Sequence, residues 1–145
     1  MIIFILLLGF ILRLININQG FWLDEAIGML AQRDLSYKGL IESLMRYDNH
    51  PPLYYLTLKF WVSVFGSGEI AVRLLSVLFG LGAIWVTYLI GKEVLIKYKN
   101  KIFGFSAPII SALLIATSGL HVYYSQEARM YSMATFFASA SVLFF

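Results

Sequence analysis

The hydrophobic positions of the chain gather in long segments separated by polar stretches, a pattern typical of helices that cross a membrane. Residues 74–91 and 102–120 carry no charge, and as helices each would rise roughly 27 Å or more, close to the thickness of the hydrocarbon core. Residues 1–17 are apolar apart from Arg13 and Asn16, and residues 130–145 form a further apolar segment. We therefore expect an all-α, polytopic transmembrane protein with about four spans.

The first and last segments each allow a second reading. A cleaved signal peptide would need a basic start and a small-residue cleavage site, and residues 1–17 show neither. As a span, this segment needs Arg13 to snorkel to the interface. The last segment stops at Phe145 before a full span is complete. We therefore expect residues 130–145 to be a truncated span and the chain to be the N-terminal part of a larger protein.

The stretch between the first two spans, residues 18–68, has a helical pattern of its own. From Tyr37 the apolar residues recur at helical spacing, with charged residues between them, which predicts an amphipathic helix lying at the membrane surface. Pro51-Pro52 forces extended backbone at His50 and opens a second helix, Leu53 to Phe65, that ends at Gly66. The next span should begin near Glu69 and cover residues 69–91.

Composition agrees with a membrane protein. The chain has 145 residues, of which 60% are hydrophobic and 13% charged, and its mean hydropathy is +0.79. A net charge of +3 spread over few residues does not indicate a nucleic-acid partner. Without cysteine there is neither a disulfide framework nor a thiolate metal site.

The placement of charge predicts the orientation in the cell (plasma) membrane. The short connection at residues 92–101 has one acidic residue, Glu93, against Lys92, Lys97, Lys99 and Lys101. Such a loop is expected to be cytoplasmic. Counting crossings from it, residues 18–68 and the outer loop 121–129 lie on the extracytoplasmic face. The candidate residues Asp24, Glu25, His50 and Glu127 should therefore share one side of the membrane.

Each candidate has a structural reading beside a functional one. Asp24 and Glu25 suit the start of a helix, where the dipole favours acids, but a partly desolvated Asp24 could also act as a general base. His50 is either a turn residue before the prolines or a ligand for metal or phosphate. Glu127 and Arg129 fit an interfacial aromatic belt, or a site in which an acid binds a cation and an arginine holds phosphate. Arg13 and Arg73 can simply snorkel.

Together these residue types suit transfer of a group from a lipid-linked phosphate to a hydroxyl. No Gly-rich phosphate loop is present, so the donor is expected to reach the site through the membrane. An acidic base would deprotonate the acceptor, and an arginine or a divalent metal ion would offset charge on the departing phosphate.

Four stretches carry a resemblance to a known family: "LDEA" (residues 23–26), "HPPLYY" (50–55), "GSGEIAVRLLSVLFG" (66–80) and "YYSQEARMYS" (123–132). In this order the chain resembles, from about Arg13 to Ser132, the N-terminal part of integral-membrane glycosyltransferases of the GT-C fold. The nearest group contains the protein O-mannosyltransferases and the aminoarabinose transferases of lipid A.

The resemblance implies transfer of a sugar from a polyprenyl-phosphate donor to a glycan, lipid or protein acceptor on the extracytoplasmic face. It implies Asp24 as catalytic base and Glu25 as its partner, with Glu127 positioning acceptor or metal. His50 matches the histidine of the family's His-Pro-Pro-Leu-Gly stretch, whereas Tyr54 replaces its glycine, which weakens the case for a protein acceptor. The candidate substrate-binding residues are His50, Tyr54, Arg73, Glu127, Arg129 and Tyr131, and the candidate metal ligands are His50 and Glu127. Relatives complete the donor site with later helices, so residues 1–145 alone are expected to be incomplete.

Two other classes of protein remain open. A secondary transporter would place ionisable residues near the middle of the membrane beside broken helices. Here the acids flank the predicted spans, although Pro108 within the third span is a feature that a transporter would share. A non-catalytic membrane fragment or assembly subunit is the third reading, and the end at Phe145 supports it.

Overall fold

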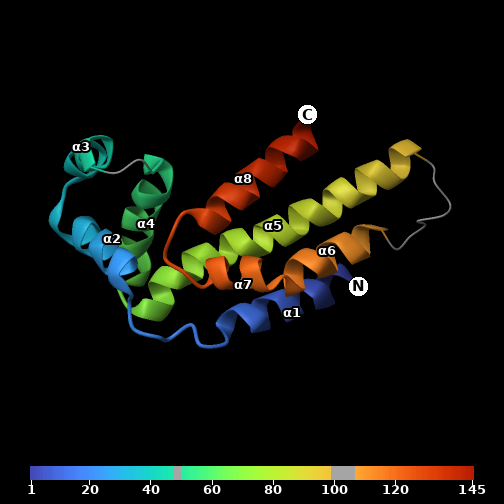
Figure 1. Cartoon of the computed structure of the whole chain (residues 1–145), viewed down its shortest axis with the longest axis horizontal. Helices are drawn as coiled ribbons and strands as arrows, with labels where there is room; N and C mark the ends of the chain where they lie inside the picture. Colours follow the sequence, from blue (N-terminus) through green and yellow to red (C-terminus); the bar gives the residue numbers. More distant parts are fainter. Residues whose placement is uncertain (48–49, 99–106) are drawn as a thin grey trace.

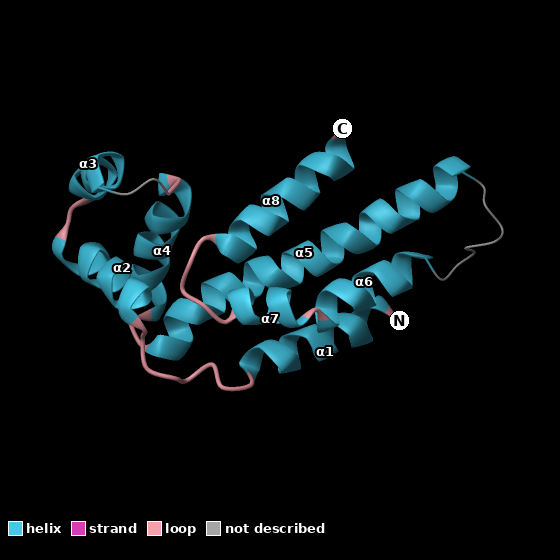
Figure 2. Cartoon of the chain, in the orientation of Figure 1, coloured by secondary structure: helices cyan, strands magenta, loops and turns pink. Residues whose placement is uncertain are grey.

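The computed structural model describes residues 1–47, 50–98 and 107–145. These residues form helices and no strands, which confirms the all-α prediction (Figure 2). In chain order the helices are α1 (Ile2–Leu14), α2 (Leu23–Asp34), α3 (Tyr37–Tyr47), α4 (Pro52–Phe65), α5 (Glu69–Tyr98), α6 (Ala107–Thr117), α7 (Gly119–Ser125) and α8 (Tyr131–Phe144).

The long helix α5 is the axis of the molecule. Helices α1 and α6 pack along one side of α5 and against each other, α7 continues from α6, and α8 packs on α5 separately (Figure 1). Helices α2, α3 and α4 form a second group at the N-terminal end of α5, which α4 contacts directly. The connections 15–22, 66–68 and 126–130 all lie where this group meets the long helices.

One described helix is long and apolar enough to cross a membrane, with its span at Glu69–Ile96 in α5. Helices α6 and α7 qualify only as one broken span, bent by 59° at Ser118. Helices α1 and α8 are apolar but shorter. The structure thus supports a candidate membrane-spanning helix, and the number of crossings belongs to the proposal below.

Several predicted boundaries were wrong. Helix α1 ends at Leu14, not at residue 17, and α5 continues to Tyr98 through much of the predicted 92–101 loop. The lysines at 99 and 101 lie outside the described residues, as does the predicted start of the third span at 102–106. Helical structure extends to Ser125, into the predicted 121–129 loop, because a second helix, α7, starts directly after the break at Ser118. Pro108 lies in the first turn of α6, where proline is tolerated, and does not cause this bend.

The predicted amphipathic elements of residues 18–68 form nearly as expected. In α3 the apolar Leu40 and Leu44 are buried while Lys38 and Glu42 face outward. Helix α4 starts with Pro52 in its first turn and ends at Gly66, whose φ of 87° is one that glycine adopts readily. The Gly66 N–H donates to the Val62 carbonyl and closes the helix.

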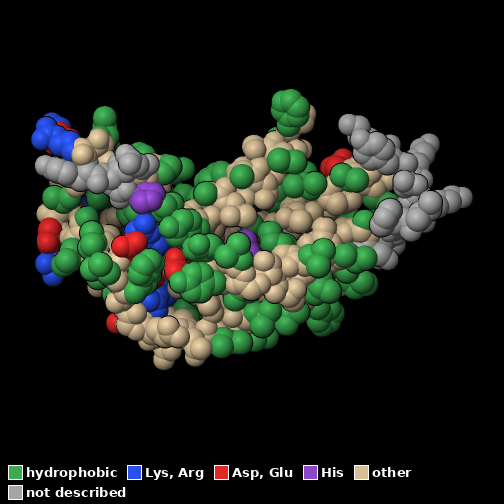
Figure 3. All heavy atoms as spheres, in the orientation of Figure 1, with side chains coloured by type: hydrophobic (Ala, Val, Ile, Leu, Met, Phe, Trp, Pro, Cys, Tyr) green, Lys and Arg blue, Asp and Glu red, His purple; other side chains and the backbone are tan. Residues whose placement is uncertain are grey.

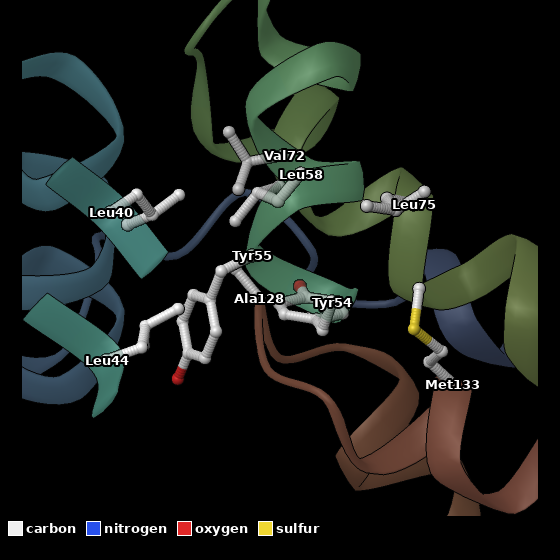
Figure 4. Packing of buried hydrophobic residues seen from close by; sticks show 9 residues of the cluster. All are labelled: Leu40, Leu44, Tyr54, Tyr55, Leu58, Val72, Leu75, Ala128 and Met133. Carbon is white, nitrogen blue, oxygen red and sulfur yellow. The ribbon is translucent and has the colours of Figure 1, made fainter. Parts of the chain in front are cut away.

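Two apolar clusters hold these parts together. The first joins α3 and α4 to α5 and to the segment before α8, with Tyr54, Leu58 and Val72 at its centre (Figure 4). The second joins α1, α5 and α6 through Ile5, Ile84, Ala112 and Ala116. Both clusters share α5, so the position of the α2–α4 group relative to the long helices is fixed by side-chain packing.

Candidate functional site

A buried ion pair between Glu25 and Arg73 organises the junction between the two helix groups. Glu25 stands in the first turn of α2, and Arg73 in the first turns of α5. The Arg73 Nε donates to Glu25 Oε1 at 3.0 Å, and Nη2 donates to Oε2 at 2.5 Å. The two side chains are only 5% and 0% exposed. Such a two-pronged contact fixes the orientation of both groups.

Arg73 uses its remaining N–H groups on the connection between α1 and α2. Its Nη1 donates to the carbonyls of Ile17, at 2.8 Å, and Gln19, and its Nη2 donates to that of Gly20. These contacts and the two to Glu25 occupy all five N–H groups of the guanidinium. Arg73 therefore does not snorkel, and it offers no N–H to a phosphate unless one of these bonds breaks.

The segment 126–130, which joins α7 to α8, is tied to the same junction. The Ala128 N–H donates to Glu25 Oε1 at 2.7 Å. The Ser76 hydroxyl, on α5, donates to the Arg129 carbonyl at 3.3 Å. Glu25 thus links α2, α5 and the segment that carries Glu127 and Arg129, which are distant from it in the sequence.

Asp24 faces a small cavity with Arg129. Arg129 Nη1 lies 3.7 Å from Asp24 Oδ2, and the Asp24 side chain is 42% exposed. Both residues line a cavity of about 160 Å³, bounded also by Gly28, Ser43 and Tyr55, that we call the α2–α3 cavity. The arrangement offers an accessible carboxylate beside a fixed positive charge.

Glu127 faces a different and larger cavity. This α1–α7 cavity has a volume of about 620 Å³ and lies between the C-terminal end of α1 and α7. Glu127 is 7% exposed, and its Oε2 has no hydrogen-bond partner among the described residues. Burial raises the pKa of Glu127 above its ordinary value of 4.5, against the opposing effect of a hydrogen bond to Tyr123. The lining residues are Leu12, Ile15, Asn16, Gln19, Gly20, Trp22, Glu25, Arg73, Val122, Tyr123, Gln126 and Glu127.

The surface around the α2–α4 group carries charged side chains. On the face shown in Figure 3, acidic and basic side chains gather in the hollow between the α2–α4 group and the long helices, while the long helices beyond it are mostly apolar. Of the residues predicted to share one side, Asp24 and Glu25 contact the segment that carries Glu127, whereas His50 does not take part in these contacts.

Three other predicted site residues, Tyr54, Tyr131 and His50, line neither cavity. Tyr54 is 1% exposed and its hydroxyl lies 3.1 Å from Ser76 Oγ, so it packs in the core instead of lining either cavity. Tyr131 lies beneath Arg129, whose guanidinium carbon is 6.0 Å from the ring centroid. His50 is half-buried and lines neither cavity.

A metal centre at His50 and Glu127 finds no support in the geometry. Within the ranges that the structure describes, no three or more His, Asp or Glu side chains are grouped so as to hold a metal ion. Cations at this junction are instead the guanidinium groups of Arg73 and Arg129, which already face carboxylates.

Sequence reasoning missed a second polar cluster, at Arg13. This side chain is 0% exposed and does not snorkel: its Nη1 donates to the carbonyls of Gly9 and Ala116, and its Nη2 lies 2.5 Å from His121 Nδ1. The signal available in the sequence was a single arginine in an apolar segment together with a histidine following another one.

The chain matches no model of a known protein family, no curated protein and no solved structure.

Proposed function

We propose that this protein is a multi-pass membrane glycosyltransferase that moves a sugar from a polyprenyl-phosphate donor to a hydroxyl acceptor at the extracytoplasmic face. The observation that carries the proposal is the Asp24 carboxylate, accessible at the α2–α3 cavity and 3.7 Å from the guanidinium of Arg129. A base beside a phosphate-binding cation is what this reaction requires. The resemblance of the four sequence stretches to GT-C glycosyltransferases supports the same reading.

In the proposed reaction Asp24 accepts the proton of the acceptor hydroxyl as the acceptor oxygen bonds to the anomeric carbon. The bond between that carbon and the phosphate oxygen breaks, and the polyprenyl phosphate leaves with the bonding electron pair. Arg129 offsets the charge of the leaving phosphate, since a planar guanidinium matches two phosphate oxygens. Glu25 and Arg73, which are fully engaged with each other and with backbone groups, hold Asp24 and Arg129 in position.

The proposal includes a topology. Helices α1, α5, the α6–α7 pair and α8 cross the plasma membrane, and the end of α5 with Lys92 is cytoplasmic. Helices α2 to α4 lie in the outer interface, where exposed apolar side chains of α4 can enter the lipid. Those side chains are Leu53, Phe60, Val64 and Phe65.

One observation favours a second candidate, a secondary transporter. The α6–α7 pair is broken at Ser118, and the buried Arg13 contacts both of its parts. Broken helices next to buried charge are typical of transporters. The transferase is favoured by the accessible carboxylate of Asp24 and by the two cavities. An assembly subunit without activity would need neither of these features.

The test is sugar transfer by the full-length protein in lipid nanodiscs, with a panel of radiolabelled polyprenyl-phosphate sugars and a mixture of lipid, glycan and peptide acceptors. Asp24→Asn should lower the rate about 10²–10⁴-fold, because it removes the base. Asp34→Asn is the matched control, since Asp34 is an exposed acid at the other end of α2 and pairs with Arg33.

Transfer that Asp24→Asn leaves intact would overturn the role of Asp24, and no transfer from any donor would count against the enzyme. An arm with EDTA tests a divalent metal ion as an alternative charge partner for phosphate. Loss of activity on chelation, restored by added metal, would assign the charge of the leaving group to a metal ion in addition to Arg129.

A further inference from the structure

Two alternate residues of the segment 126–130 form hydrogen bonds to neighbouring parts of the chain. Gln126 is held through its side chain by α1, and Ala128 through its N–H by Glu25. Glu127, which follows Gln126, lines the α1–α7 cavity. Arg129, which follows Ala128, lines the α2–α3 cavity. The direction of each of these two side chains therefore depends on how the residue before it is attached.

Gln126 closes the C-terminal end of α1. Its Nε2 donates to the Ile15 carbonyl at 2.6 Å and lies 3.3 and 3.4 Å from the carbonyls of Leu12 and Arg13. The last carbonyls of a helix have no hydrogen-bond partner within the helix. A donor from another element satisfies them and fixes the position of that element along the helix. This amide comes from the residue directly before Glu127.

A second contact joins α1 to α6 and α7, and here the side chain comes from α1. Arg13, in the last turn of α1, reaches the Ala116 carbonyl at 3.2 Å and His121 Nδ1 in α7. Because a guanidinium only donates, Nδ1 must be the acceptor in this pair. The start of α7 is thus held by Arg13 and its end by Gln126, and the two contacts fix the short helix against α1.

We propose that Gln126 is a positioning residue that sets the direction in which Glu127 enters the α1–α7 cavity. Its amide attaches the end of α7 to the last turn of α1, so losing the donor releases the backbone at residue 127. The consequence for catalysis rests on the proposed function, whereas the mechanical consequence can be measured without any activity.

The mechanical test uses spin labels, for which the absence of cysteine in the chain is convenient. Labels at Ile11→Cys on α1, which is exposed, and at Tyr124→Cys near the end of α7, which is partly exposed, report in nanodiscs the distance between α1 and the part of α7 that Gln126 holds. Gln126→Met keeps the size of the side chain and removes its donors, and it should broaden the distance distribution. Gln126→Lys restores a donor and should narrow it again.

Thr117→Val is the matched control, because among the described residues the exposed Thr117 hydroxyl bonds only to the Leu113 carbonyl of its own helix. It should leave the distribution unchanged. An unaltered distribution in Gln126→Met would overturn the proposal, as would broadening of equal size in the control. These results do not depend on whether the protein transfers sugar.

The catalytic consequence is measured with a double-mutant cycle between Gln126→Met and Glu127→Gln. The resemblance implies that Glu127 positions the acceptor; if Gln126 acts through Glu127, Gln126→Met lowers kcat by about 10²-fold with little change in KM, and it adds nothing in the Glu127→Gln background. Additive losses, the result of general destabilisation, would overturn the link. If the wild-type protein has no activity, the proposed function fails while the distance measurement still decides the role of Gln126.

Discussion

Asp24 and Glu25 are neighbours in the chain, yet a rotation of about 100° between successive helical residues sends their carboxylates to different surroundings. Glu25 turns inward to Arg73 and the Ala128 N–H, while Asp24 remains accessible near Arg129. The sequence indicated that both acids belong to the site. It could not separate their roles, because the face that α2 buries is decided by α5 and by the 126–130 segment.

Removing one partner of the buried pair should be costly. Glu25→Gln leaves the Arg73 guanidinium buried without a full counter-charge and should lower the free energy of unfolding by about 3–5 kcal/mol. Denaturant or thermal unfolding in detergent measures it. Asp34→Asn, which breaks an exposed pair, should change little, and equal stability of the two variants would contradict the structural role of Glu25.

Glu127 should make stability depend on pH. Burial raises its pKa above 4.5 in the folded protein, so the folded state binds the proton more tightly than the unfolded state does. Its stabilising effect is present below pH 4.5 and is lost as pH rises through the raised folded value. The test is to measure the Tm of the wild type and of Glu127→Gln from below pH 4.5 to above the raised pKa of the folded state. As the pH rises, the Tm of the wild type should fall relative to that of the variant. Parallel pH profiles of the two Tm values would refute the prediction.

At the scale of elements, periodicity and terminator residues predicted α3, α4 and the start of α5 well, because those signals act locally. The extension of α5 to Tyr98 and the bend between α6 and α7 were not predictable in this way. Polar residues suggested a loop where α5 continues, and nothing near Ser118 other than a glycine marks the bend. The bend lies where α1 packs against both α6 and α7. Residues 92–96 of α5 are mostly exposed, so the helix continues there through good helix formers such as Lys, Glu and Leu and not through burial.

The close packing of α5 on α6 depends on a glycine. A Cβ added at Gly91 would lie 2.8 Å from the Cα of Pro108, which as backbone cannot move aside. Gly91→Ala should therefore push the helices apart and cost about 1–3 kcal/mol of stability. Gly119→Ala is the control, because a Cβ there meets no atom of the described residues within 4 Å. Unfolding measurements that find Gly91→Ala no worse than Gly119→Ala would contradict this contact.

At the scale of the whole molecule, the charge asymmetry of the sequence predicted that remote acids would share one side of the membrane. The structure brings Glu25 into contact with Arg73 and with the 126–130 segment, and the side of the membrane on which they lie stays a prediction. What could not be predicted is the presence of two cavities on either side of the segment. The α2–α3 cavity depends on how α2, α3 and α4 pack together, and the α1–α7 cavity depends on how α7 lies against α1 and the 15–22 connection.

The orientation can be tested by labelling single cysteines in intact cells. Gln19→Cys and Tyr123→Cys line the α1–α7 cavity and should react with a membrane-impermeant maleimide added outside. Glu93→Cys, at the far part of α5, should react only after the cells are permeabilised. Reaction of positions 19 and 123 from opposite sides would eliminate the proposed site.

The buried arginine of α1 also bears on how the protein is made. Apart from the Gly9 carbonyl of its own helix, its contacts lie 103 and 108 residues later in the chain. During synthesis the first helix is therefore made before the two residues that accept hydrogen bonds from its buried arginine have been translated. If α1 crosses the membrane as proposed, it has to be sheltered by the insertion machinery or by water until α6 and α7 are made, so the earliest helix is among the last to reach its final environment.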